Sequence, residues 1–108
     1  MEKTVTEAIA YRRSTRVYQD IPIDTEKVKQ CLVNASLAPT SSNLQLWEFY
    51  HITNKDILAK LAHACFNQSA AKTAQQMVVI VTRKDLWRQR AKANIDFLND
   101  IYNKPNLE

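Results

Sequence analysis

The chain has 108 residues, of which 45% are hydrophobic and 24% charged, with a formal net charge of +4 and no glycine. Its length fits one compact domain, so we expect residues 1–108 to form a single domain. The lack of glycine excludes the glycine-rich phosphate loops of P-loop and dinucleotide-binding proteins. No apolar run approaches the ~20 residues of a membrane span, and the first residues do not resemble a secretory signal. We therefore expect a cytoplasmic protein with no membrane partner.

Hydrophobic spacing predicts two helices in the first third of the chain. The first covers residues 4–12, followed by an extended or looped segment up to Pro22. Asp24 is a suitable N-cap for a second helix that runs to about residue 37. The residues expected on the buried face of this second helix are Val28, Cys31, Leu32 and Ala35.

A polar break over residues 38–46 separates the second helix from a predicted strand over residues 47–53, which is rich in aromatic and β-branched residues. Asn54 then predicts the start of a third helix. The apolar residues expected to form its buried face are Leu58, Leu61, Ala62 and Cys65.

The last third of the chain predicts one more strand and one more helix. A short segment over residues 68–76 leads into the continuous apolar run 77–81, which is typical of a strand buried on both faces. Thr82 and Asp85 have the spacing of a capping box that would open a final helix. Its expected inner face consists of Trp87, Ala91, Ile95, Leu98 and Tyr102.

The predicted order is α-α-β-α-β-α, which indicates an α+β fold with helices packed around a partial β-sheet. Two strands alone form a marginal sheet. We therefore expect a sheet that is incomplete without a second half or a partner. Cys31 and Cys65 lie on apolar helix faces, and no metal-type spacing accompanies them. They are expected to be buried free thiols rather than a disulfide or metal pair.

A cluster of bases and hydroxyls follows the first helix, in the sequence Arg12-Arg13-Ser14-Thr15-Arg16. Guanidinium groups bind phosphate through paired hydrogen bonds. In an extended segment Arg12, Ser14 and Arg16 would point the same way and could hold one phosphate together. The alternative is that these arginines cap the helix C-terminus and offset its dipole, with no ligand involved.

Two further polar segments are candidates for a ligand site. The stretch from Ala38 to Trp47 is dense in hydroxyls and amides, which suits the rim of a planar heterocycle or its ribityl chain. The alternative is a turn that uses the same groups to satisfy its own backbone. Asn67 follows the third helix, where it is either a ligand contact or a helix C-cap.

Taken together, these three segments resemble the FMN-dependent nitroreductase family. Arg12, Ser14 and Arg16 match its opening Arg-x-Ser-x-(Arg/Lys) motif, which contacts the FMN phosphate and ribityl group in that family. Residues 39–47 match its Pro-Ser-Ser-x-Asn-x-Gln-Pro-Trp loop, and Asn67 matches an asparagine that contacts the flavin. The site residues that the resemblance implies are Arg12, Arg13, Ser14, Arg16, Pro39, Thr40, Ser41, Asn43 and Asn67.

The chain departs from the family pattern in ways that affect the expected site. Thr40 replaces the first serine of the loop, and Leu46 replaces the proline before Trp47. Ala70 and Ala71 occupy the stretch where some members have a basic residue. Family members also continue into a second half with more strands and further phosphate ligands. The chain therefore resembles the amino-terminal half of a nitroreductase domain, and we expect weak or absent FMN binding and little turnover from it alone.

The resemblance implies an NAD(P)H-dependent oxidoreductase with FMN as its cofactor. NAD(P)H would reduce the flavin and leave, and a nitroaromatic or quinone would then be reduced in the same pocket by a ping-pong scheme. The flavin carries this chemistry, so no catalytic side chain and no metal are expected. The family resemblance also implies a homodimer, in which the loop that contains Thr40 and Asn43 lines the flavin of the partner subunit.

Two other functions remain open from the residues themselves. One is a nucleic-acid-binding basic module, whose face would consist of Arg83, Lys84, Trp87, Arg88, Arg90 and Lys92. The other is a structural or dimerisation fragment that retains the flavin motifs without activity. The resemblance favours a small-molecule enzyme with no nucleic-acid partner. The physiological substrate and the preference for NADH or NADPH do not follow from the sequence.

Overall fold

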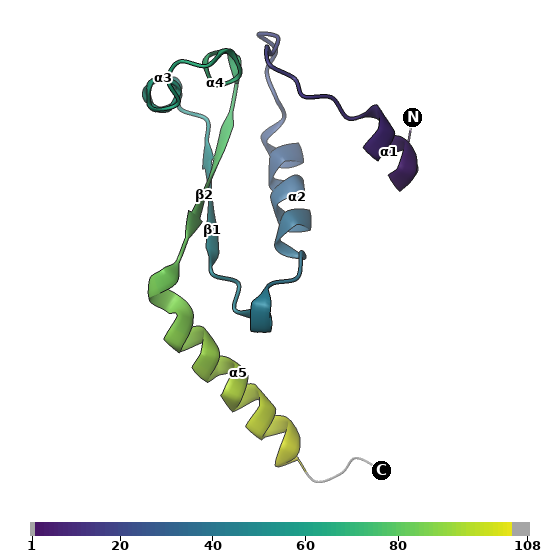
Figure 1. Cartoon of the computed structure of the whole chain (residues 1–108), viewed down its shortest axis with the longest axis vertical. Helices are drawn as coiled ribbons and strands as arrows, with labels where there is room; N and C mark the ends of the chain where they lie inside the picture. The colour runs from purple at the N-terminus through teal and green to yellow at the C-terminus, as the bar shows by residue number, and fades with distance from the viewer. Residues whose placement is uncertain (1, 105–108) are drawn as a thin grey trace. The chain divides into compact units, whose positions relative to one another are not determined.

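The computed structural model describes residues 2–104 and confirms the α+β class (Figure 1). In chain order the elements are α1 (Val5–Tyr11), α2 (Thr25–Ser36), the 3-10 helix η1 (Ser41–Asn43), β1 (Trp47–Ile52), α3 (Lys55–Ala64), α4 (Ser69–Thr73), β2 (Met77–Thr82), the 3-10 helix η2 (Lys84–Leu86) and α5 (Trp87–Tyr102).

The starts of the first three long helices follow from their capping residues. Thr4 forms a capping box with Glu7, in which each residue binds the backbone of the other, and this hydrogen bonding lowers the pKa of the Glu7 carboxyl. Asp24 accepts the backbone N–H of Glu26 at the start of α2. Asn54 accepts two backbone N–H groups at the start of α3. The predicted N-caps Asp24 and Asn54 are therefore confirmed.

The two strands β1 and β2 pair as one antiparallel sheet. The ladder continues one residue beyond the strands, where the backbone N–H of Arg83 donates to the carbonyl oxygen of Leu46 at 3.0 Å. Both strands are β-branched or aromatic over most of their length, which suits a pleated surface. Among the described residues the sheet has two strands, as the sequence predicted.

The described chain divides into two compact units. The first contains residues 2–23 and 52–77, and the second contains residues 24–51 and 78–104. Both units are built from segments that lie far apart in the sequence, so neither is a contiguous stretch of chain. That the chain forms one domain stays a prediction.

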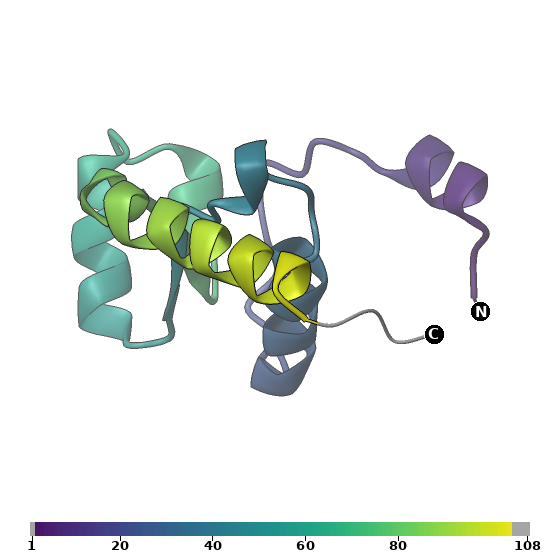
Figure 2. The same cartoon turned by 90° about the horizontal axis from the view of Figure 1, so that it is seen from below.

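The first unit is organised around α3 and α4, which lie side by side in both views (Figures 1 and 2). Its buried centre is on α3, where Leu58 is 8% and Ala62 6% exposed. Two hydrogen bonds join distant segments of this unit. The backbone N–H of Tyr18 donates to Thr73 Oγ1 at 2.9 Å, and Gln76 Nε2 donates to the carbonyl oxygen of Ile23 at 2.8 Å.

Near the sheet, one short helix was not predicted and two predicted local features are wrong. The segment 68–76 contains the five-residue helix α4, which is too short to show a hydrophobic period. Thr82 and Asp85 do not form a capping box, because α5 begins at Trp87 without a side-chain cap. The run 77–81 is not buried on both faces. Ile80 is 67% exposed, because the described chain supplies no further layer to cover it.

The expected burial of the helix faces is also wrong for much of the chain. Cys31 and Cys65 are both exposed free thiols rather than buried ones. The α5 face remains largely open, with Ile95 at 57% and Tyr102 at 82% exposed. The amphipathic pattern is present in each helix, but burial requires a second apolar surface in contact with it. Within the described residues, Leu58 and Ala62 are the only hydrophobic side chains that are buried.

Candidate functional site

The structure places the predicted site residues in two groups. The arginine segment and Asn67 belong to the first unit, and the loop over residues 39–43 belongs to the second.

The arginine segment leaves α1 in an extended conformation. Arg12 is the C-cap of the helix, with φ −52° and ψ 137°, and the following residues through Arg16 are exposed coil. Arg12 Nη1 lies 3.5 Å from Ser14 Oγ, so these two side chains reach toward the same region as the alternation predicted. At that distance the hydrogen bond is weak, and both groups retain capacity for another acceptor.

Arg13 takes the helix-capping role that the sequence left open. Its Nη1 donates to the carbonyl oxygens of Ala10, Tyr11 and Arg12, at 2.8, 3.3 and 3.1 Å. These are carbonyls at the C-terminal end of α1, where a cation is favoured by the helix dipole.

The three guanidinium groups of this segment remain unneutralised. Across residues 2–104, the ion pairs found do not include Arg12, Arg13 or Arg16. A cavity of about 320 Å³ lies beside Arg12 and Arg13, and Tyr11 and Thr15 complete its lining. Exposed cations within five residues of one another repel, so a bound anion would lower the energy of the segment.

The loop before β1 has an unusual backbone for a chain without glycine. Ser42, Asn43 and Gln45 have φ of 50°, 50° and 49°, in the left-handed region that most side chains disfavour. Ser42 and Asn43 fall inside η1, which interrupts the regular helical conformation at Ser42. Leu44 between them returns to the right-handed region.

Hydrogen bonds within the loop offset this conformational cost. The backbone N–H of Asn43 donates to the carbonyl oxygen of Thr40 at 3.0 Å, and the N–H of Gln45 donates to Thr40 Oγ1 at 3.1 Å. Gln45 Nε2 donates to Asn43 Oδ1 at 2.9 Å. Thr40 therefore follows the alternative given for this loop, because its carbonyl and hydroxyl oxygens accept backbone N–H groups of the same turn. The exposed hydroxyl of Ser41 takes no part in it.

Asn67 ends α3 in a Schellman motif. The N–H of Asn67 donates to the carbonyl oxygen of Ala62 at 2.9 Å, and the N–H of Phe66 donates to that of His63 at 3.0 Å. Phe66 and Asn67 both have positive φ, of 56° and 53°. The backbone of Asn67 thus completes the helix end, while its side-chain amide has no hydrogen-bond partner among the described residues and is open to a ligand.

Left-handed backbone is confined to these two segments. All five non-glycine residues with positive φ in the described chain lie either in the loop or at the Schellman motif, namely Ser42, Asn43, Gln45, Phe66 and Asn67. Such residues cost roughly 1–3 kcal/mol each and cluster at binding and catalytic sites. The two segments that carry this strain are the ones that resemble flavin-contacting motifs.

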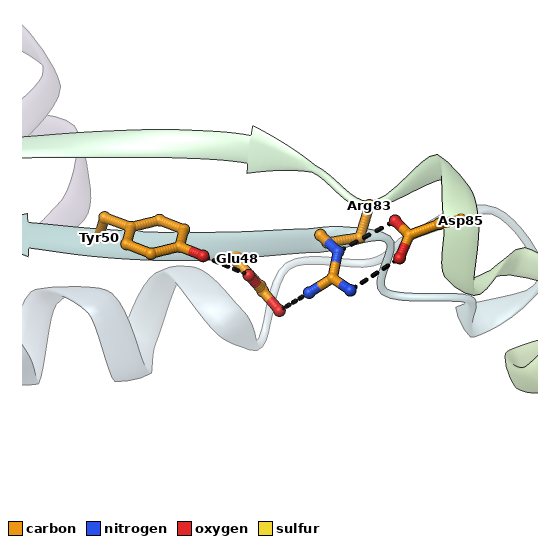
Figure 3. Close-up of polar contacts among 4 residues, drawn as sticks. All are labelled: Glu48, Tyr50, Arg83 and Asp85. Atoms are coloured by element: carbon orange, nitrogen blue, oxygen red, sulfur yellow. Dashed lines mark hydrogen bonds and ion pairs between the residues drawn. The ribbon is translucent and has the colours of Figure 1, made fainter.

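An ionic cluster joins the ends of the two strands in the second unit (Figure 3). Arg83 pairs with Glu48 of β1 and, through two nitrogens, with Asp85 of η2. The Tyr50 hydroxyl donates to the other oxygen of Glu48 at 2.9 Å, which raises the pKa of Tyr50. Arg83 lowers the pKa of Asp85, and Asp85 in turn raises the pKa of Arg83. The cluster closes the sheet end and offers no free cation.

The ion pairs of the second unit reduce the charge of the basic face that was considered for nucleic-acid binding. Two of the bases assigned to that face are already paired, because Arg83 contacts Glu48 and Asp85, and Lys92 contacts Asp96 at 2.6 Å. Arg88 lies over the ring of Trp87, with 5.3 Å between its Cζ and the ring centroid. The positive charge available to phosphates on α5 is therefore smaller than the residue count indicates.

A second cavity in the first unit was not predicted from the sequence. It measures about 450 Å³, with Leu58 and Ala62 of α3 in its wall. Its polar and charged lining residues are Tyr18, Asp20, Thr53, Lys55, Lys72, Thr73 and Gln75. None of these residues stands in a motif, so no sequence signal could have grouped them.

Within residues 2–104, no three His, Cys, Asp or Glu side chains are grouped so that they could hold a metal ion. Over the same residues, each helix is too short or too polar to cross a membrane.

Comparison of the sequence with known proteins finds relatives that are named as nitroreductases. An oxygen-insensitive NADPH nitroreductase of Helicobacter acinonychis is 29% identical over 82 residues, which are 75% of this chain and 38% of that protein. A provisionally named NADH dehydrogenase/NAD(P)H nitroreductase of Archaeoglobus fulgidus is 34% identical over 89 residues, 76% of this chain and 51% of its own. The chain thus spans about half or less of the length of these curated relatives.

Solved structures share the fold. A provisionally named nitroreductase of Exiguobacterium sibiricum, crystallised in complex with FMN, superposes with a TM-score of 0.69 at 26% identity, covering 96% of this chain and 59% of that one. An FMN-dependent nitroreductase of Clostridium difficile superposes with a TM-score of 0.61 at 30% identity, over 81% of this chain and 53% of its own. The nitroreductase family model matches residues 9–106. The chain belongs to the nitroreductase family.

Proposed function

We propose that this chain supplies the phosphate-binding segment and the flavin-lining loop of an FMN-dependent NAD(P)H oxidoreductase. The proposed reaction is the reduction of nitroaromatics or quinones by a ping-pong scheme. Membership of the family and NAD(P)H nitroreductases among the relatives support an oxidoreductase of this class. The cytoplasmic location expected from the sequence stays a prediction.

The observation that carries the proposal is the confinement of left-handed backbone to the loop and to the end of α3. A chain without glycine adopts this conformation only where surrounding interactions enforce it. Both segments correspond in sequence to flavin-contacting motifs. The strain therefore falls where the proposed cofactor would be bound, and the α-helices and strands of the described chain are free of it.

The donor set fits FMN in its chemistry. Arg12 and Arg16 provide guanidiniums that have no carboxylate partner among residues 2–104, and Ser14 provides a hydroxyl, which together suit a terminal phosphate. Arg13 keeps one nitrogen on α1 and adds positive charge beside that phosphate. We infer that Asn67 contributes its free amide to the isoalloxazine edge.

The loop is proposed to act on the ring system. Pro39, Thr40, Ser41 and Asn43 would lie against the isoalloxazine of a second copy of the chain, as the family resemblance implies. When bound, FMN supplies the hydride chemistry between NAD(P)H and the oxidising substrate. The protein's own side chains bind and orient it, and no side chain is assigned a proton-transfer step.

This proposal includes either a homodimer or a missing carboxy-terminal half. The open apolar face of α5, with Ile95 and Leu98 at 57% and 49% exposure, supports a need for additional protein surface. For the same reason we expect FMN binding by these 108 residues to be weak and turnover to be low. Robust NAD(P)H oxidation by the 108-residue chain would contradict that expectation.

The test compares FMN with riboflavin, which lacks the phosphate. Titration of each flavin into the purified chain, followed by flavin fluorescence, should give about tenfold tighter binding for FMN, since each charged hydrogen bond contributes roughly 1.5–3 kcal/mol before solvent screening. Arg12→Gln and Arg16→Gln should reduce this preference toward unity. Arg90→Gln removes the same charge from α5 and should leave the preference unchanged.

Two results would overturn the proposal. One is the absence of FMN binding by the purified chain at millimolar FMN, as measured by flavin fluorescence. The other is equal affinity for FMN and riboflavin in the parent chain, which would show that the arginine segment does not bind phosphate. Salt-dependent binding of random DNA by a colourless protein would instead favour the nucleic-acid alternative.

A further inference from the structure

The loop over residues 40–45 is held almost entirely by its own hydrogen bonds. In the described chain, the bonds of Thr40, Asn43, Leu44 and Gln45 all remain within residues 40–47. Internal bonds of this kind close a turn, but they leave the turn free to change shape as a whole. Three left-handed residues within four positions are strained, and this strain favours a change in the shape of the turn.

One hydrogen bond fastens this loop to a regular element of the same unit. Asn94 Nδ2, on α5, donates to the backbone carbonyl oxygen of Ser42 at 2.6 Å, across 52 residues of sequence. Asn94 is half-buried and lies in the interior of a 16-residue helix, which is a rigid support. The carbonyl that it binds belongs to the first of the three left-handed residues.

We propose that Asn94 is a positioning residue for the flavin-lining loop. Its side-chain amide fixes the carbonyl of Ser42 and thereby holds Ser42 and Asn43 in the left-handed conformation. This inference rests on the proposed function, because the loop is assigned to the flavin there. Asn94 itself contacts neither cofactor nor substrate in this scheme.

The direction of the effect follows from the backbone geometry. If the donor is removed, Ser42 and Asn43 can relax toward right-handed or extended conformations, which are lower in energy for residues with a Cβ. Such a change redirects the side chains of Ser41 and Asn43, two of the predicted flavin contacts. Preorganisation of a binding loop increases affinity because the ordering cost is met before the ligand arrives.

The test uses the 108-residue chain and four variants. Asn94→Leu removes the donor at similar size, Asn94→Asp removes it while keeping the shape, and Asn94→Gln retains an amide donor. Asn99→Leu is the matched control on the same helix, since in the described chain the Asn99 side chain makes no hydrogen bond to the loop. Circular dichroism establishes that each variant is folded.

Two measurements decide the outcome. Residue-resolved amide hydrogen exchange should show at least tenfold faster exchange at Asn43, Leu44 and Gln45 in Asn94→Leu and Asn94→Asp, with Asn99→Leu unchanged and Asn94→Gln largely restored. The FMN dissociation constant should rise about five- to tenfold in the same two variants, with a shift in the visible absorption of bound FMN.

Equal exchange at these three amides in Asn94→Leu and Asn99→Leu would overturn the role of Asn94. If exchange increases as expected but the FMN affinity and spectrum do not change, the loop is positioned for something other than the flavin and the proposal also fails. If the parent chain and Asn99→Leu do not bind FMN at all, the proposed function fails. In that case the exchange pattern still decides whether Asn94 holds the loop.

Discussion

The guanidinium of Arg83 binds the carboxylate of Asp85 through two parallel contacts, with Nε 3.0 Å from Oδ1 and Nη2 2.7 Å from Oδ2. This planar, bidentate pairing is the geometry that arginine and carboxylate favour. It occupies Asp85 just before α5, so the carboxylate is not available to cap that helix. The pairing does not use Nη1 of Arg83, and this nitrogen binds Glu48 of β1.

Acid should weaken the contribution of the Arg83–Asp85 pair to the stability of the folded state. Arg83 lowers the pKa of Asp85 below its ordinary value of 3.8, so the folded state holds the proton less tightly than the unfolded state does. The stabilisation is therefore present above the unfolded pKa and is lost as the pH falls through the folded pKa. We expect Asp85→Asn to lower the urea midpoint at pH 7, with the difference from the parent shrinking below about pH 4.

The control for this prediction is Asp100→Asn, an exposed aspartate of α5 without an ion pair in the described chain. It should leave the urea midpoint unchanged at both pH values. A difference between Asp85→Asn and the parent that stays constant from pH 7 to pH 3 would contradict the assignment.

Truncation of Leu58 should be the most damaging change in the first unit. Its side chain is 8% exposed, and deletion of a buried leucine side chain to alanine costs about 2–5 kcal/mol. Because the core is small and a cavity already lies beside it, we expect a loss near the lower end of that range. Ile57→Ala, at a neighbouring position with 46% exposure, should cost less than about 1 kcal/mol. Urea unfolding followed by circular dichroism measures both.

Glycine at position 66 should stabilise the end of α3. Phe66 has a φ of 56° and is 89% exposed, so its side chain makes little packing contribution while its Cβ opposes the left-handed conformation. Phe66→Gly removes that opposition, whereas Phe66→Ala retains it. We expect the glycine variant to be more stable than the alanine variant by about 1 kcal/mol. Inside a helix the order would be reversed, so the comparison also tests the Schellman motif.

Both thiols should react in the folded chain. Cys31 and Cys65 are exposed, so a thiol reagent should label them without denaturant at rates close to those of the unfolded protein. Labelling of the single variants Cys31→Ser and Cys65→Ser shows which labelling rate belongs to which cysteine. If an assembled form covers one of these faces, labelling at that cysteine slows with protein concentration. Protection of both thiols at low micromolar concentration would contradict the exposure seen in the structure.

The local features of this chain were predictable because their causes lie a few residues apart. Asp24 and Asn54 cap helices through bonds to backbone groups two or three positions ahead, and such bonds form whatever the rest of the fold does. The capping box proposed for Thr82 and Asp85 failed because Asp85 pairs with Arg83, two residues earlier, and not with the helix start. Only the second partner of Arg83, Glu48 of β1, is distant in the sequence.

The candidate site divides in the same way. The sequence by itself determined the order of the strands and α-helices apart from α4, but not the 3-10 helices η1 and η2. Three short motifs in register also indicated the nitroreductase family without any coordinates. Only the tertiary structure revealed the left-handed backbone at Ser42 and Asn67, the bond from Asn94 to Ser42, and the exposure of both cysteines. Capping and helical periodicity depend on near neighbours. Burial, long-range hydrogen bonds and enforced backbone strain depend on which surfaces meet, and a single sequence read in order does not contain that information.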